Sequence, residues 1–234
     1  MAFDTAAENK VPYLYHWERL DLGKVEQTLA TNSIYCPNPS QFNDPWDGKP
    51  HFNTAILDDP EENERHVQWA VGLFRKQQPP LPEQEIARRE AILRTDRPFA
   101  AGVIEQFSGA MAQAIAAQYR VYCLGTDATN QLMWAHYADS HRGVCLEFVV
   151  RDFVMCGALK CEYLEDYPVI KHYEDETTQI LRMVRIKAKV WEYEDEYRLI
   201  AFERPAVPTQ DTLVTENNLL QLGRETLSAV IVGC

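Results

Sequence analysis

Two glutamates separated by one residue, near the end of the chain, are the residues best suited to acid/base chemistry. Glu194 and Glu196 flank Asp195, and Arg198 follows shortly after. If both glutamates lie on one strand face, their carboxylates sit side by side and repulsion raises the pKa of one of them. Such a pair suits proton transfer or stabilisation of an oxocarbenium-like transition state. The alternative is a solvated acidic turn in which Arg198 is the ion-pair partner.

A second group of reactive side chains lies in one short segment near the middle of the chain. At helical spacing, Trp134, Tyr137 and His141 share one face, and His136 lies on a neighbouring face. Gly143 stands where a helix would end. These side chains could form a binding surface, or the aromatics could be core residues and the histidines hydrogen-bonded caps.

A proline-rich loop over residues 37–48 carries the third group, Asn43, Asp44 and Asp47. Three prolines and a glycine predict a rigid loop, and such loops often present functional side chains. Asn and Asp side chains also commonly satisfy backbone donors within turns, and that interpretation stays open.

A metal site could combine Asp44 and Asp47 with His136 and His141, because carboxylate and imidazole ligands suit manganese or iron. The two histidines, however, lie on different faces of the predicted helix. We therefore expect no metal cofactor, and a metal-dependent hydrolase or nuclease remains an alternative.

The order of the strands and helices that must position these groups predicts an α+β fold. We expect its sheet to be mixed and largely antiparallel, either as one sheet or divided into two. A strand over 11–17 carries His16, a strand over 121–125 precedes Thr126, and another begins at Glu196. The chain shows no regular alternation of strands and helices, no dinucleotide-binding glycine motif and no P-loop. We expect one domain over 1–234, with 58–118 as a helical insertion within it.

Between these elements, residues 174–187 are predicted to form a helix. Arg182, Arg185, Lys187 and Lys189 lie close together there. We interpret them as a solvated basic face rather than a binding patch.

Composition limits the possible partners. The formal net charge is −12, which disfavours sequence-independent binding to a nucleic-acid backbone. No segment approaches the roughly 20 apolar residues of a membrane span, and the N-terminus has no signal-peptide pattern. We therefore expect a cytoplasmic protein without a membrane partner. The six cysteines have no C-x-x-C spacing, which argues against a zinc ribbon or a disulfide scaffold.

The three groups together resemble a bacterial and phage family, domain of unknown function 2971. The resemblance covers roughly residues 11–233 and does not itself provide an activity. Its motifs in this sequence are Phe42-Asn43-Asp44-Pro45-Trp46-Asp47, then Met133-Trp134-Ala135-His136-Tyr137 with His141 and Gly143, then Trp191, Glu194, Glu196 and Arg198.

At the level of fold, the order of parts resembles the ADP-ribosyltransferases. That resemblance implies that His16 bonds the nicotinamide ribose of NAD, that Tyr137 or Trp134 stacks on nicotinamide, and that Glu196 holds a ribose hydroxyl. The strict Ser-Thr-Ser motif of that fold is absent. The resulting prediction has Glu194 and Glu196 as catalytic residues. It has the following NAD-binding residues: His16, Asn43, Asp44, Asp47, Thr126, Trp134, His136, Tyr137, His141 and Arg198.

The first functional hypothesis is therefore an NAD-consuming enzyme, a toxin or phage-defence effector that binds a small-molecule nucleotide and modifies an acceptor that the sequence does not identify. The metal-dependent hydrolase is the second. The third is a non-catalytic module that binds a nucleotide or a protein in the same pocket and shows ligand stabilisation without turnover.

Overall fold

The computed structural model describes residues 4–20, 23–44, 47–49, 52–166, 171, 173, 176–205 and 212–234, with the backbone alone for 176–178. The chain divides into two compact units. The first comprises Met1–Lys49, Ala114–Tyr167 and Leu181–Cys234, and the second comprises Pro50–Gln113 and Pro168–Ile180. Every residue discussed as part of the site belongs to the first unit.

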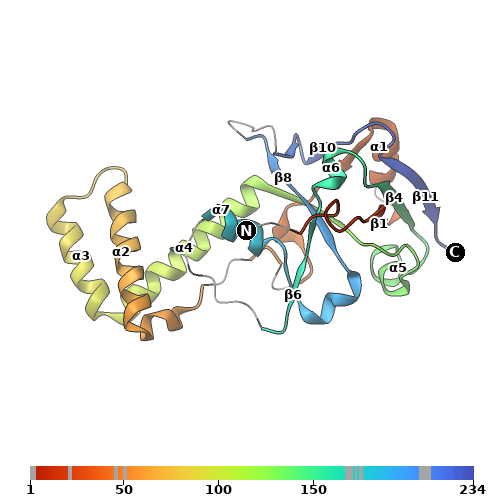
Figure 1. The fold of residues 1–234 in the computed structure, drawn as a ribbon. Coiled ribbons are helices and arrows are strands. Elements are labelled where there is room, and N and C mark those ends of the chain that lie inside the picture. Colours follow the sequence, from red (N-terminus) through yellow and green to blue (C-terminus); the bar gives the residue numbers. More distant parts are fainter. Residues whose placement is uncertain are drawn as a thin grey trace. The chain divides into compact units, whose positions relative to one another are not determined.

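The first unit contains an antiparallel sheet in the order β1 (Tyr13–Glu18), β4 (Val144–Val149) and β11 (Leu227–Val232) (Figure 1). In the register of β1 and β4, Leu14 pairs with Phe148, and both side chains are fully buried. This apolar face packs into the main core of the unit. The β-branched and aromatic residues of these segments explain why they form strands.

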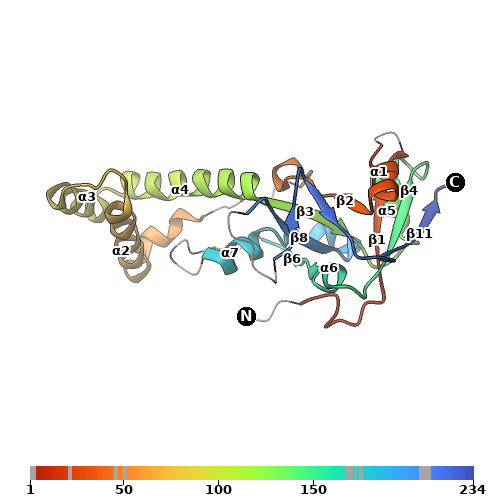
Figure 2. The same ribbon diagram turned by 90° about the horizontal axis from the view of Figure 1, so that it is seen from above.

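A second antiparallel sheet has the order β3 (Tyr119–Leu124), β8 (Tyr197–Glu203) and β5 (Leu159–Lys160), with β9 (Val214–Thr215) parallel to β8. Strands β3 and β8 of this sheet are labelled in Figure 2. The central strand β8 is the predicted late strand. Its Arg198 pairs with Cys123 of β3 on one side and with Leu159 of β5 on the other. The largely antiparallel α+β architecture is therefore confirmed.

One backbone bridge joins β1 to the end of β3. The Tyr15 N–H donates to the Gly125 carbonyl at 2.9 Å, and the Gly125 N–H donates to the Tyr15 carbonyl at 2.8 Å. A Cβ at position 125 would lie 2.9 Å from the Trp17 ring. Glycine is therefore required there because the indole packs directly on the backbone.

Shorter elements complete the first unit. They are α1 (Lys24–Thr31), β2 (Ser33–Tyr35), the 3-10 helix η2 (Pro39–Gln41), α5 (Gln131–Tyr137), α6 (Phe153–Cys156), β6 (Glu162–Leu164), β7 (Ile186–Ala188), the 3-10 helix η4 (Lys189–Glu194) and β10 (Leu219–Gln221). β2 pairs with β10 in antiparallel fashion, and β6 pairs with β7 in parallel fashion. Asn130 caps α5 by accepting from the Leu132 and Met133 N–H groups.

The predicted helical segment is confirmed as α2 (Pro60–Lys76), α3 (Glu83–Thr95) and α4 (Arg97–Gln118), preceded by the 3-10 helix η3 (Thr54–Asp58). Helices α2 and α3 are antiparallel, and the predicted proline-rich turn connects them (Figure 1). Arg94 of α3 binds Glu64 of α2 across the pair. Among the described residues, no helix has the length and apolarity to cross a membrane.

The prediction of one helix over 174–187 is wrong at its C-terminal end. The helix α7 (Glu176–Met183) stops early, and Ile186–Ala188 form β7 against β6. Residues 174 and 175 lie outside the described residues. The predicted solvated basic face is wrong at two positions, because Arg185 and Lys187 are buried.

Candidate active site

A cavity of about 180 Å³ lies between β1, β3 and the segment that runs from β7 into β8. An engineered cavity of roughly 150 Å³ binds benzene, so this space suits one group of the size of a single ring. Its apolar walls include the rings of Trp17, Phe42 and Tyr122. The charged and reactive residues that line it are His16, Asn43, Asp47, Tyr137, Lys187, Glu194, Glu196 and Arg198.

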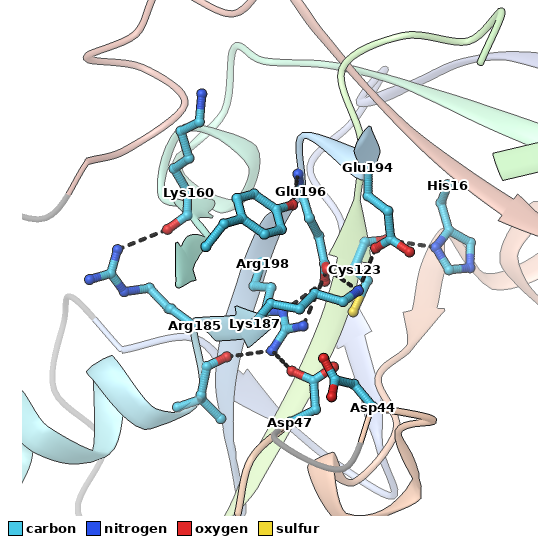
Figure 3. A network of polar contacts seen from close by, with 12 residues as sticks. His16, Asp44, Asp47, Cys123, Lys160, Arg185, Lys187, Glu194, Glu196 and Arg198 are labelled. Atoms are coloured by element: carbon cyan, nitrogen blue, oxygen red, sulfur yellow. Dashed lines mark hydrogen bonds and ion pairs between the residues drawn. The ribbon is translucent and has the colours of Figure 1, made fainter. Parts of the chain in front are cut away.

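Arg198 is the centre of the charged side of the cavity, and its side chain is 0% exposed. Its Nε donates to Glu196 Oε1 at 2.7 Å, and its Nη1 lies 2.7 Å from Asp47 Oδ1 (Figure 3). Nη1 also donates to the carbonyl of Val184 at 2.7 Å. The residue therefore ties the proline-rich loop and the chain before β7 to the central strand β8.

Lys187 is the second buried cation. Its Nζ donates to Glu196 Oε2 at 2.8 Å and also contacts Glu194 Oε2 (Figure 3). The ammonium lies 5.2 Å from the centre of the Trp191 ring, which adds a cation–π contact. Because the short strand β7 directs this lysine inward, the two glutamates share one cation.

The two predicted catalytic glutamates do not lie on one strand face. Glu194 ends the helix η4, Glu196 precedes β8, and Asp195 between them adopts a left-handed backbone with φ 42°. Their carboxylates nevertheless meet at Lys187. Acidic and basic side chains thus alternate along one buried row of ion pairs, in the order Asp47, Arg198, Glu196, Lys187, Glu194.

The environment separates the pKa values of the two glutamates. Burial raises the pKa of Glu194 above its ordinary value, and the Lys187 ammonium only partly opposes this effect. Burial acts in the same direction on Glu196, but Arg198 and Lys187 outweigh it and hold the pKa of that carboxyl far below its ordinary value. Burial likewise raises the pKa of Asp47. Glu194 is therefore the better proton acceptor and Glu196 the better fixed anion.

Opposite pH dependences should follow when each glutamate is replaced by glutamine. A raised folded-state pKa makes Glu194 cost stability above the ordinary value near 4.5, so wild type should gain stability relative to Glu194→Gln as the pH falls from 7 towards 4.5. A lowered pKa makes Glu196 stabilising above 4.5, so wild type should lose stability relative to Glu196→Gln as the pH falls below that value. Calorimetric melting temperatures between about pH 3.5 and 7 measure both slopes, and slopes of equal sign would contradict this assignment.

Tyr137 and His16 approach the cavity from two other elements. The Tyr137 hydroxyl of α5 donates to Glu194 Oε1 at 2.7 Å, and burial together with the Glu194 charge raises the pKa of the phenol. The Asn43 side chain also bonds to this hydroxyl. His16 of β1 stacks on Tyr122 with ring centres 4.1 Å apart. Its Nδ1 lies 2.8 Å from the Cys123 carbonyl, which positions Nδ1–H as the donor.

Asp44 anchors the loop from below the cavity rather than lining it. Its carboxylate is buried, and Oδ2 accepts the Ala188 N–H at 3.3 Å. This bond holds the end of β7, which is the strand that carries Lys187. The neighbouring motif residues Pro45 and Trp46 lie outside the described residues.

Besides Asp44, four other predicted site residues do not line this cavity. Trp134 is buried in a small apolar cluster, and its Nε1 donates to the Ala128 carbonyl at 2.7 Å. His141 stacks on Trp134 with ring centres 6.0 Å apart. Thr126 donates to Asp195 Oδ2 at 2.5 Å. His136 lines a neighbouring hollow.

The described residues contain no group of three or more His, Cys, Asp and Glu side chains that is arranged to hold a metal. In this cavity the carboxylates already have cationic partners. Arg198 binds Asp47 and Glu196, and Lys187 binds both glutamates, so cationic side chains occupy the positions in which a metal would pair with the carboxylates.

Lys187 is the site residue that sequence reasoning missed. A signal for it did exist. Asp47, Glu194 and Glu196 were all candidate site residues, and one arginine cannot neutralise three buried carboxylates. Burial of unpaired charge is prohibitively costly, so a second inward-facing cation was required.

In comparisons with protein-family models, curated proteins and solved structures, no match to this chain was found. Evidence for its function therefore comes from the geometry of the site.

Proposed function

We propose that the chain is an NAD-consuming enzyme of the ADP-ribosyltransferase type, with the nicotinamide end of NAD in the cavity. The observation that carries the proposal is the convergence of His16, Tyr137 and Glu194 on one ring-sized space. These residues come from β1, from the helix after β3 and from the segment before β8. That order of elements is the order of functional parts in the resemblance to ADP-ribosyltransferases, although the resemblance gave the ribose contact to Glu196 and we assign it to Glu194.

The size and charge of the cavity support this substrate. Nicotinamide is a single flat ring, and in NAD it carries a positive charge. Among the described residues that line the cavity, three carboxylates face two cations, so the lining has an excess of negative charge. Aromatic walls and nearby anions favour a cationic ring.

In the proposed reaction the bond between the ribose C1′ and the nicotinamide nitrogen breaks, and the nitrogen keeps the bonding electrons. Positive charge develops on the ribose, where the Glu194 carboxylate would stabilise it. Water or an acceptor group then bonds to C1′ and gives its proton to Glu194, whose raised pKa suits that role. Glu196 is the positioning residue because it fixes both Lys187 and Arg198.

The first experiment is a measurement of nicotinamide released from NAD by the purified chain, with and without cell extract as a source of acceptor. Release is the expected result. NADH is the matched control, because its ring is neutral, and we expect it to bind more weakly. Absence of release together with absence of NAD binding would contradict the proposal.

A non-catalytic binding module is the second candidate. The observation in its favour is that Lys187 already pairs with both glutamates, which leaves neither carboxylate without an ion-pair partner. It predicts that NAD stabilises the folded chain with the logarithmic dependence on ligand concentration that mass action gives, while no nicotinamide appears even with extract.

A further inference from the structure

The hollow that His136 lines adjoins the cavity. It encloses about 320 Å³ and shares His16, Trp17, Pro37 and Tyr137 with the cavity as walls. The two spaces therefore lie side by side, and only these shared side chains stand between a ring in the cavity and the hollow. His136, which the sequence placed among the ligand-binding residues, lies on the wall of this second hollow.

The charge of the second hollow is opposite to that of the cavity. Its charged lining residues, among those the structure describes, are Arg19, Lys24 and Glu18. Lys24 Nζ lies 3.7 Å from Glu18 Oε1 and 5.3 Å from the centre of the Tyr35 ring. The Glu18 carboxylate thus contacts Lys24 and also His16, whose Nε2 lies 3.4 Å from Glu18 Oε2, and the exposed Arg19 adds a further positive charge. Arg19, Lys24 and Glu18 together contribute a net charge of +1 to the hollow, in a chain whose net charge is −12.

We propose that this hollow binds the phosphate groups of the same ligand, so that Arg19 and Lys24 select a phosphorylated nucleotide over a nucleoside. The inference rests on the proposed function, because it assumes that the ring in the cavity belongs to a nucleotide. Phosphate oxygens accept charge-assisted hydrogen bonds from guanidinium and ammonium groups. The aromatic side chains of Tyr35 and His136 flank the cations and offer apolar contact to the attached sugar.

The test compares ADP with adenosine, which differ in the phosphates, by calorimetric titration of the full chain. Wild type should bind ADP more tightly. The Arg19→Gln/Lys24→Gln variant should lose about tenfold in ADP affinity and keep its affinity for adenosine. The matched control is Arg142→Gln/Lys189→Gln, which makes the same change in net charge outside the hollow and should bind ADP as wild type does.

Three outcomes would overturn the inference: no measurable ADP binding by wild type, equal ADP affinity in the two double variants, or inorganic phosphate competing as well as ADP. The nicotinamide assay separates this failure from that of the proposed function. Release by wild type with an unchanged KM for NAD in the Arg19→Gln/Lys24→Gln variant would refute the phosphate site alone. ADP binding that depends on Arg19 and Lys24, without any release, would refute the enzyme and leave the phosphate site standing.

Discussion

Glu194→Gln should lower the rate of nicotinamide release by about a hundredfold to a thousandfold while the chain stays folded. Removal of one preorganised group that stabilises developing charge costs roughly this much in characterised enzymes. The fold should tolerate the change because the raised pKa of Glu194 shows that its site favours the neutral form, which glutamine resembles. Release from NAD and the melting temperature would be measured on the same preparation.

The chain supplies a close control for this variant. Glu192 lies two residues earlier in the same helix η4, is exposed and pairs with Lys189 on the surface. Glu192→Gln should release nicotinamide at the wild-type rate. A rate for Glu194→Gln equal to that of this control would remove Glu194 from the mechanism.

Glu196→Gln distinguishes the roles of the two glutamates. The resemblance gave the ribose contact to Glu196, whereas in the structure Arg198 and Lys187 hold both carboxylate oxygens of Glu196. Glutamine can replace only part of that pairing, so we expect this variant to lose stability together with activity. If Glu196→Gln instead abolished release at unchanged stability while Glu194→Gln remained active, the roles would be reversed.

Arg198→Met should destabilise the chain by about 3–5 kcal/mol, the range measured when one partner of a buried ion pair is removed. Methionine fills similar space but leaves the carboxylates of Asp47 and Glu196 buried without this cation. Denaturant unfolding would measure the loss. Arg204→Met is the control, because Arg204 follows the end of β8 and is more than half exposed, and it should change stability little.

A double-mutant cycle shows whether the loss comes from charge rather than from shape. Once Arg198 is methionine, Lys187 is the remaining ion-pair partner of Glu196 among the described residues. Glu196→Gln should therefore cost less in the Arg198→Met background than in wild type, and it could even stabilise that background. Equal costs in the two backgrounds would mean that the pair does not act as a unit.

The sequence predicted those helices and strands in which the periodic pattern of apolar residues extends over enough positions to distinguish a helix from a strand. Helices α2 to α4 and the strands that carry His16 and Arg198 follow from periodicity over many residues. Strand β7 has three residues, too few for an alternating pattern, and its partner β6 lies more than twenty residues earlier. The preceding helical pattern was therefore extended through it.

The structure brings together the charged side chains among the predicted site residues, but it does not bring all of the predicted aromatics to the same cavity. Asp47, Glu194, Glu196 and Arg198 meet because each needs a partner of opposite charge. Trp134 carries no such requirement, and an aromatic at helical spacing fits the core as well as it fits a pocket. Its indole N–H donates to the Ala128 carbonyl, and its ring packs in an apolar cluster.

The bridge between Tyr15 and Gly125 has a mechanical consequence. His16 and Trp17, which follow Tyr15 directly, form one part of the cavity wall, and Tyr122 to Leu124, which end directly before Gly125, form the adjoining part. The two backbone hydrogen bonds hold these adjoining parts together, and the Trp17 ring packs against Gly125. This side of the cavity therefore moves as one piece unless the pair of bonds opens. Adaptation of the cavity to a ligand then has to come from its other lining segments, the loop with Phe42 and Asn43 and the segment with Lys187 and Glu194.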